Sequence, residues 1–346
     1  MKTTKELTTG ATEGKEAPSK SPFPFGLIES DLLGMYYHLL LSRLVDERMW
    51  SLNRQGKVPF TISCRGHEAA QVGTAYALRK GTDFVVPYYR DIGVVLVMGM
   101  TPRDLMLSLF AKAEDPSSGG RQMPNHFGHA ALKIITGSSP VATQIPQAVG
   151  IALASKIKRE EAVTIVYFGD GATSKGDFHE GLNFAGIHKL PIVFVCEDNG
   201  YAISVPHNRQ MAIQDVADRA AGYGFPGVVV DGNDVLAVYG IAKEGIERAR
   251  GGGGPTLIEA KTYRLMPHSS DDDDRRYRSQ EEVEEWRRKD PILRFRSYLE
   301  GKAVLPEVRE QEIRERVIRE IDEAVAYAVN SPYPDPVGLF DNLYCV

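Results

Sequence analysis

The sequence predicts an α/β fold in which a parallel, doubly wound sheet is flanked by helices. Short apolar runs rich in Val, Ile and Phe, typical of buried strands, alternate along the chain with segments of helical length. In the clearest case, Val163–Phe168 and Pro191–Cys196 enclose a predicted helix at about Lys175–His188. Strand, helix and strand in that order make parallel strands joined by a right-handed crossover. The same alternation returns at residues 227–262, which predicts one sheet.

The composition is that of an ordinary globular protein. The 346 residues suffice for one large α/β domain or two average ones. A net charge of −5 gives no support for nucleic-acid binding, and no apolar run approaches membrane-spanning length. The three cysteines are isolated and lack metal-ligand spacing, which favours a reducing cytoplasm. The N-terminal lysines are not followed by the apolar core of a secretory signal.

Three parts are expected along the chain. Residues 1–25 contain few large apolar side chains and are predicted to form a disordered arm or, alternatively, an arm that packs on a partner. Residues 26–300 hold the alternating strands and helices of the α/β domain. Residues 301–346 are expected to form a C-terminal helix, with apolar residues on one stripe, and a Pro-rich tail.

Capping residues predict where several helices begin. Ser30 is expected to cap the first long amphipathic helix, and Ser279 with Glu282 to form a capping box for a late one. Another helix is expected to begin near His67. Capping and packing explain His67 and Glu68 without any role in chemistry.

Polar residues follow two neighbouring predicted strands. Asp170 lies in a Gly-Asp-Gly turn directly after one strand, and Asn199 follows the next. Ligands bind at this edge of open α/β sheets. The glycines allow close approach, and the amides that open the following helix suit an anion such as a diphosphate. One carboxylate, one carboxamide and the backbone carbonyl of Tyr201 suit Mg²⁺, which takes its remaining ligands from phosphate and water.

The Gly-Asp-Gly turn alone is typical of a plain loop, and its combination with Asn199 predicts the site. Tyr89 and Arg90 follow the short predicted strand Phe84–Val86. Their donor groups suit a phosphate. The alternative is that Arg90 pairs with Asp91 or another carboxylate.

The Gly-Asp-Gly and Asn spacing resembles the thiamine diphosphate motif of thiamine-dependent enzymes. Other segments resemble the alpha subunits of the first component of branched-chain 2-oxo acid dehydrogenases, namely Arg65–Gly73, Pro87–Asp91, Gly120–His126, Ser138–Gly150, Val230–Tyr239 and Thr262–Asp273. The resemblance covers about residues 27–298. It implies a thiamine diphosphate-binding fold.

The resemblance implies oxidative decarboxylation of branched-chain 2-oxo acids, with reductive transfer of the acyl group to a lipoyl group on an acyltransferase component. It implies thiamine diphosphate and Mg²⁺ as cofactors, with K⁺ as a further candidate. It also implies a beta subunit, in a heterotetramer of two alpha and two beta chains. The family's glutamate that faces the aminopyrimidine ring belongs to that subunit and has no counterpart here. Neither a nucleic acid nor a membrane is an expected partner.

The same resemblance assigns roles to individual residues. His268 matches the active-site histidine, and Arg264 would support its loop. Cofactor contacts are implied for Tyr89, Arg90, Ser139, Val141, Asp170, Gly171, Ala172, Glu197, Asn199, Tyr201, Ile203 and His268. Substrate contacts are implied for Phe60, Tyr89, Met123, Pro124, Asn125, His126 and Ser139, although an ordinary core role is an alternative for Phe60. Mg²⁺ would be bound by Asp170, Asn199 and Tyr201, and K⁺ by Ser138, Pro140, Thr143 and Gln144.

The chain departs from the animal relatives at a few positions. Glu197 stands where they carry an Arg that contacts the diphosphate. Since an acid repels a diphosphate, Glu197 is expected to point elsewhere or to act through a partner. Val141 replaces a Leu that bends the cofactor. Ser269 and Ser279 match positions of regulatory phosphorylation in animals, and nothing in the sequence indicates a kinase for this chain.

Three rival functions can be compared with this prediction. The first is the same chemistry on pyruvate or acetoin, since pocket size decides acyl-chain preference. The second is a nicotinamide oxidoreductase, which would need a G-x-G-x-x-G after an early strand, and the early strands lack it. The third is a non-catalytic scaffold or binding subunit, which predicts no cofactor affinity in the assembled complex.

Overall fold

The structure, a computed structural model, describes residues 21–341, so most of the predicted N-terminal arm lies outside the described residues. Its centre is a sheet of five parallel strands in the order β1-β2-β3-β7-β6, which confirms the predicted parallel sheet. The strands are β1 (Phe84–Val86), β2 (Thr164–Gly169), β3 (Ile192–Asp198), β6 (Gly227–Asp231) and β7 (Thr256–Lys261).

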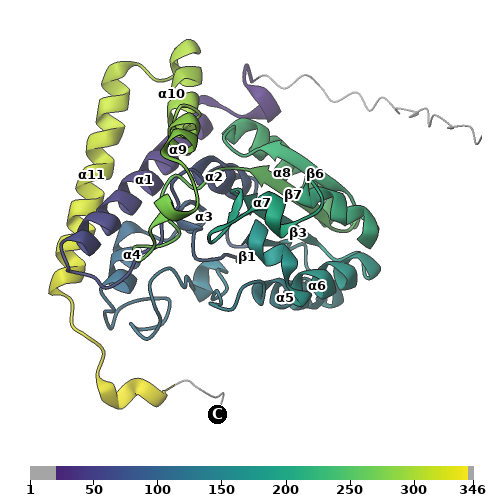
Figure 1. Cartoon of the computed structure of the whole chain (residues 1–346), viewed down its shortest axis with the longest axis horizontal. Coiled ribbons are helices and arrows are strands. Elements are labelled where there is room, and N and C mark those ends of the chain that lie inside the picture. The colour runs from purple at the N-terminus through teal and green to yellow at the C-terminus, as the bar shows by residue number, and fades with distance from the viewer. Residues whose placement is uncertain (1–20, 342–346) are drawn as a thin grey trace, which may run out of the picture.

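Helices cover both faces of the sheet, as predicted for a doubly wound fold (Figure 1). One face carries α2 (Glu68–Tyr76) and α8 (Val235–Arg250), and the other carries α5 (Gln144–Lys158) and α6 (Gly176–Ile187). Two apolar cores result, because successive side chains of each strand point to opposite faces. On β2, Ile165 belongs to the first core and Val166 to the second.

A helical layer packs on the face that carries α2. The long helix α1 (Glu29–Arg54) lies beside α11 (Glu307–Asn330), and both belong to the first core (Figure 1). The division at residue 301 stays a prediction. The remaining helices and strands are α3 (Ile92–Met98), α4 (Pro102–Leu109), β4 (Tyr201–Ala202), β5 (Val205–Pro206), α7 (His207–Gln210), α9 (Gln280–Arg287) and α10 (Pro291–Gly301).

Two capping predictions need correction. Helix α1 begins at Glu29, and the Asp31 carboxylate accepts the Ile28 amide at 2.9 Å, so Ser30 is not the cap. Ser279 does accept the Glu282 amide at 3.2 Å. The Glu282 carboxylate, however, binds the Tyr201 hydroxyl at 2.9 Å instead of completing a capping box. A tertiary contact therefore replaces the local one.

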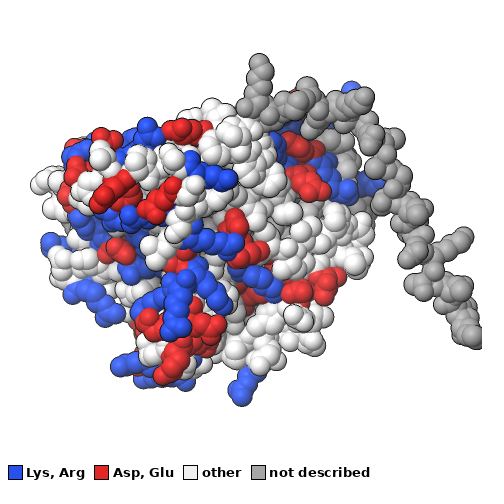
Figure 2. Space-filling model, turned by 90° about the horizontal axis from the view of Figure 1, so that it is seen from above, with Lys and Arg blue, Asp and Glu red and all other residues white. Residues whose placement is uncertain are grey.

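Lys and Arg side chains are interspersed with Asp and Glu side chains on the face shown in Figure 2. Neither sign of charge dominates there, which agrees with the modest net charge of −5. Among the described residues, no helix combines the length and the apolar character that crossing a membrane requires.

Gly66 allows two segments to approach closely, which yields a stability prediction. Its φ is +94°, and a Cβ there would lie 1.9 Å from the Tyr263 carbonyl oxygen. Gly56 also has a positive φ, of +70°, but a Cβ there would meet nothing within 4 Å. We expect Gly56→Ala to lower the free energy of unfolding by about 1–2 kcal/mol, the cost of left-handed backbone for an L-residue.

Gly66→Ala should cost about 1–3 kcal/mol more, because the backbone must also move. Urea unfolding of both variants checks this. Equal losses in the two variants would contradict the close approach.

Candidate active site

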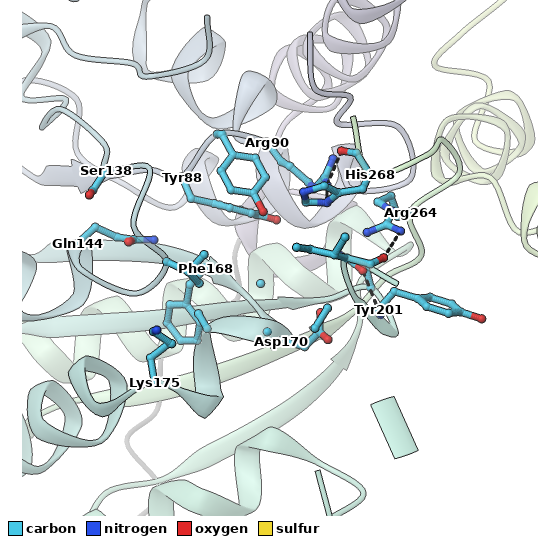
Figure 3. A pocket seen from close by; sticks show the side chains of 18 residues that line it. Tyr88, Arg90, Ser138, Gln144, Phe168, Asp170, Lys175, Tyr201, Arg264 and His268 are labelled. Carbon is cyan, nitrogen blue, oxygen red and sulfur yellow. Dashed lines mark hydrogen bonds between the residues drawn. The ribbon is translucent and has the colours of Figure 1, made fainter. Parts of the chain in front are cut away.

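The pairing of β2 with β3 sets up the site at the carboxyl edge of the sheet. In its register Gly169 lies beside Glu197, so both strands end at the same edge. Asp170 and Asn199 then follow directly. A cavity of about 270 Å³ opens there, with both residues in its wall. Figure 3 shows Asp170 on the sheet side of the cavity, with Arg90 and His268 across from it.

Asp170 is suited to binding a cation. Its side chain is 1% exposed, and neither carboxylate oxygen has a hydrogen-bond partner among the described residues. Burial and the nearby Asp198 carboxylate raise the pKa of Asp170 to about 7. A buried carboxylate without donors is costly, so its oxygens favour a metal ion. Asp170 therefore fits a divalent cation.

The turn after β3 places further polar atoms beside Asp170. The Asn199 side-chain oxygen accepts the Tyr201 amide at 3.2 Å, and Asp198 accepts the Gly200 amide at 3.0 Å. The Tyr201 ring reaches Glu282, so only the backbone of this residue remains for a ligand. In the part of the chain described, no three His, Cys, Asp or Glu side chains form a metal cluster. A metal here would therefore need ligands from a bound phosphate or water.

Arg90 and His268 form the opposite wall. The buried Arg90 guanidinium donates to the His268 carbonyl and to its ring nitrogen Nδ1, each at 2.9 Å (Figure 3). Because Nδ1 accepts from an arginine, the neutral imidazole carries its proton on Nε2. Burial, together with the positive charges of Arg90 and Arg264, lowers the pKa of His268 to about 3. His268 is therefore neutral at physiological pH and offers an N–H donor.

Arg264 links the His268 loop to the β4 turn. Its guanidinium donates to the Ile203 carbonyl at 2.7 Å and to the Tyr277 hydroxyl at 2.8 Å. Tyr277 in turn donates to Asp272, whose carboxylate accepts the His268 amide at 2.7 Å. Burial and the Arg90 charge lower the pKa of Arg264 to about 10. Two buried arginines at one cavity favour an anion between them.

The cavity brings most of the predicted cofactor residues together. Those in its wall are Tyr89, Arg90, Val141, Asp170, Gly171, Ala172, Asn199, Tyr201, Ile203 and His268, and Arg264, predicted to support the His268 loop, also lines it. Ser138 and Gln144, predicted for K⁺, also line it, and the Gln144 side-chain oxygen is buried without a partner in the described chain. Pro140 and Thr143, also predicted for K⁺, do not line the cavity. The Thr143 hydroxyl donates instead to the Asp177 carboxylate at 3.5 Å.

The predicted substrate residues other than Tyr89 lie outside the cavity wall. His126 contacts Ser139 Oγ at 2.6 Å through Nε2 and the Met123 carbonyl at 3.0 Å through Nδ1. Asn125 is buried and donates to the Ile62 carbonyl at 3.0 Å, so its side chain does not face the cavity. Phe60 and Pro124 are also absent from the wall. Substrate roles for these residues stay predictions.

Glu197 points away from the cavity, as expected from its charge, and the cofactor contact that the resemblance implied for it is corrected, because its side chain does not line the cavity wall. It is fully buried, and one oxygen contacts His67 Nδ1 at 2.7 Å. The same oxygen accepts the Tyr88 hydroxyl at 2.9 Å and Gln71 Nε2 at 3.2 Å. These three polar neighbours hold the Glu197 carboxylate outside the cavity wall, which lessens its repulsion for a diphosphate.

Four residues of the cavity wall were not predicted from the sequence, namely Tyr88, Phe168, Lys175 and Ala202, whereas Gly169 belongs to the predicted Gly-Asp-Gly turn. Tyr88 adjoins the predicted Tyr89, and Phe168 ends a predicted strand. Their position at strand ends was the available signal. Lys175 immediately precedes α6, where the exposed start of a helix meets the cavity.

Comparison with known proteins identifies the class. Residues 36–337 match the model of the dehydrogenase E1 component family. The chain belongs to this family, whose members depend on thiamine diphosphate. The predicted family is therefore confirmed, as is its class of reaction, oxidative decarboxylation of 2-oxo acids.

Individual relatives show which members of this family the chain resembles. The chain is 55% identical to the 2-oxoisovalerate dehydrogenase subunit alpha of Bacillus subtilis, over 92% of this chain and 97% of the relative. It is 41% identical to a 3-methyl-2-oxobutanoate dehydrogenase subunit alpha of Mycobacterium tuberculosis, over 92% and 84%. It is 40% identical to a pyruvate dehydrogenase E1 component subunit alpha of Staphylococcus aureus, over 92% and 83%.

The raised pKa of Asp170 leads to a prediction for the chain without metal or cofactor. Its folded pKa, about 7, lies above its usual value of 3.8, so the folded chain binds this proton more tightly than the unfolded chain. Asp170 therefore makes the chain less stable as pH rises from about 4 to about 7, with no further loss above that.

The substitution Asp170→Asn should remove this pH-dependent loss of folding stability. At about 1.4 kcal/mol per pKa unit, the variant should gain stability over wild type on the order of 4 kcal/mol at pH 8 and about 1 kcal/mol at pH 4.5. Urea unfolding of both proteins at the two pH values measures the difference. A pH-independent difference would refute a buried, unpaired carboxylate.

Proposed function

We propose that this chain is the alpha subunit of an E1 component that decarboxylates branched-chain 2-oxo acids such as 2-oxoisovalerate. The observation that carries the proposal is the buried, unpartnered Asp170 carboxylate facing Arg90 across the cavity. It offers cation binding and anion binding within one site. The 55% identity to a 2-oxoisovalerate dehydrogenase alpha subunit supports the substrate class.

Asp170, the side-chain oxygen of Asn199 and the backbone carbonyl of Tyr201 would bind Mg²⁺. Arg90, Tyr89 and the amides at Gly171 and Ala172 would bind the diphosphate. The charges are complementary, because a Mg²⁺ ion offsets the Asp170 charge and a diphosphate offsets the crowded Arg90 and Arg264. The unpartnered oxygen of Gln144 and the hydroxyl of Ser138 would serve K⁺.

Thiamine diphosphate, when bound, supplies the carbon nucleophile and accepts the electron pair that CO₂ leaves behind. The protein's part is to hold and orient the reactants. His268 would donate its Nε2–H to an oxygen of the substrate, because its lowered pKa keeps the imidazole neutral. Arg90 fixes the ring through Nδ1, and Arg264 fixes the loop through Tyr277 and Asp272.

A beta subunit would cover the mouth of the cavity. Val141 is 44% exposed and Ile203 is 57% exposed, although both line the cavity. Apolar side chains at a site entrance favour burial by a partner. Asp170 is the one acid among the described residues of the wall, so the glutamate that the family places at the cofactor would come from this partner. The assembly would contain two alpha and two beta chains.

The acyl product would pass to a lipoyl group on an acyltransferase component. The same chemistry on pyruvate is the second candidate, because a pyruvate dehydrogenase alpha subunit is 40% identical. Acetoin stays an alternative substrate, and a non-catalytic role predicts no cofactor binding. We place the complex in the cytoplasm, with Cys64 and Cys196 buried and free.

Titration calorimetry tests the site on the chain co-expressed with its beta partner. Thiamine diphosphate with Mg²⁺ should bind to wild type, and Asp170→Ala should weaken binding by more than about 100-fold, because a metal ligand is lost. Glu247→Ala, a change to an exposed acid of α8, should bind like wild type.

Turnover of 2-oxoisovalerate, pyruvate and acetoin by the same complex then ranks the substrates. A higher kcat/KM for pyruvate would favour the second candidate. No cofactor binding by wild type would favour the scaffold role.

A further inference from the structure

The segment of residues 61–66 does not line the cavity, but it contacts Arg90, the loop that contains Asn125 and the loop that carries His268. Its Ser63 carbonyl accepts Arg90 Nη1 at 2.7 Å, which among the described residues is the one hydrogen bond of the Arg90 guanidinium besides its two to His268. Its Ile62 carbonyl accepts Asn125 Nδ2 at 3.0 Å. The segment thus holds the Arg90 side chain from behind and anchors the loop that contains Asn125.

The same segment forms hydrogen bonds with the loop that carries His268, on both sides of this residue. The Leu265 amide donates to the Arg65 carbonyl at 3.1 Å, on one side of His268. On the other side, the Ser270 amide donates to the Thr61 carbonyl at 3.0 Å, and Ser270 Oγ accepts the Thr61 amide at 3.3 Å. The position of the imidazole therefore depends on where the 61–66 segment lies.

One side chain of α1 holds this segment in place. The Asp46 carboxylate accepts the Cys64 amide at 3.0 Å, Ser63 Oγ at 2.9 Å and Arg65 Nε at 2.7 Å. Asp46 is fully buried and is absent from the cavity wall. Since three donors from consecutive residues converge on one buried carboxylate, losing its charge would weaken all three hydrogen bonds at once.

We propose that Asp46 is a positioning residue for the active site. It holds the 61–66 segment, and this segment sets the places of the Arg90 guanidinium and the His268 imidazole. The consequence for cofactor binding rests on the proposed function. The consequence for the His268 loop does not, and it can be measured without cofactor.

The chain offers a matched control in Asp83. It is also fully buried, and its carboxylate accepts two backbone amides, those of Arg79 at 2.8 Å and Val163 at 2.9 Å. It pairs with an arginine, Arg250, at 2.8 Å. Asp83 precedes β1, so it lies at the edge of the sheet opposite to the cavity. Asp83→Asn should cost similar stability without touching the site.

The experiment compares Asp46→Asn with Asp83→Asn in the assembled alpha–beta complex. Hydrogen exchange by mass spectrometry on a peptide covering residues 262–272 reports the loop, before any cofactor is added. Asp46→Asn should raise exchange of the Leu265 and Ser270 amides at least 10-fold, and Asp83→Asn should leave it unchanged. Calorimetry with thiamine diphosphate and Mg²⁺ should show binding weakened about 10-fold or more in Asp46→Asn alone.

Unchanged exchange in Asp46→Asn, or the same rise in both variants, would overturn the proposal and make Asp46 a purely structural acid. Failure of wild type to bind cofactor would instead remove the proposed function, and the exchange result would still decide the positioning role. If Asp46→Asn does not fold, Ser63→Ala decides, because it removes one of the three donors and leaves the carboxylate its other two. A rise in exchange at 262–272 in Ser63→Ala supports the proposal, and no rise overturns it.

Discussion

The parallel hydrogen-bonded pairing of β2 with β3 is the constraint on which the rest of the site depends. Its register places Gly169 beside Glu197, so the chain leaves both strands at one edge of the sheet. A shift of one residue would turn the strand side chains to the opposite face. The two cores oppose such a shift, because neighbours on β2 such as Ile165 and Val166 belong to different cores. Burial of apolar side chains thus determines where Asp170 and Asn199 meet.

Burial of the charged groups at this edge sets its electrostatics. The pKa values of Asp170, Arg264 and His268 all move toward the neutral form, and burial is the first cause in each case. The Asp198 carboxylate raises the pKa of Asp170 further, and the Arg90 charge lowers the pKa values of Arg264 and His268 further. Opposite charges on opposite walls make the cavity complementary to a ligand that carries both a cation and an anion. A neutral His268 beside Arg90 follows from the same crowding of positive charge.

Much of the fold and part of the site followed from local sequence. Alternating apolar runs and helical segments predicted the parallel sheet, and the glycines around Asp170 marked a strand end. The partners toward which individual side chains turn could not be predicted from local sequence. Glu197 turns to His67, which is 130 residues away, and Glu282 turns to Tyr201 instead of capping its own helix. Each of these directions is set by a partner that only the fold brings near.

The sequence by itself determined the order and type of the strands and helices, because hydrophobic periodicity and turn residues act over short distances. It also placed Asp170 and Asn199 at strand ends, since that needs only the βαβ order. Tertiary structure alone decided which residues face the cavity. It buried Asp170 without a partner, drew Asn125 to the Ile62 carbonyl and joined Arg90 to His268 across 178 residues. Burial and hydrogen bonding between distant segments are long-range effects, and no local pattern encodes them.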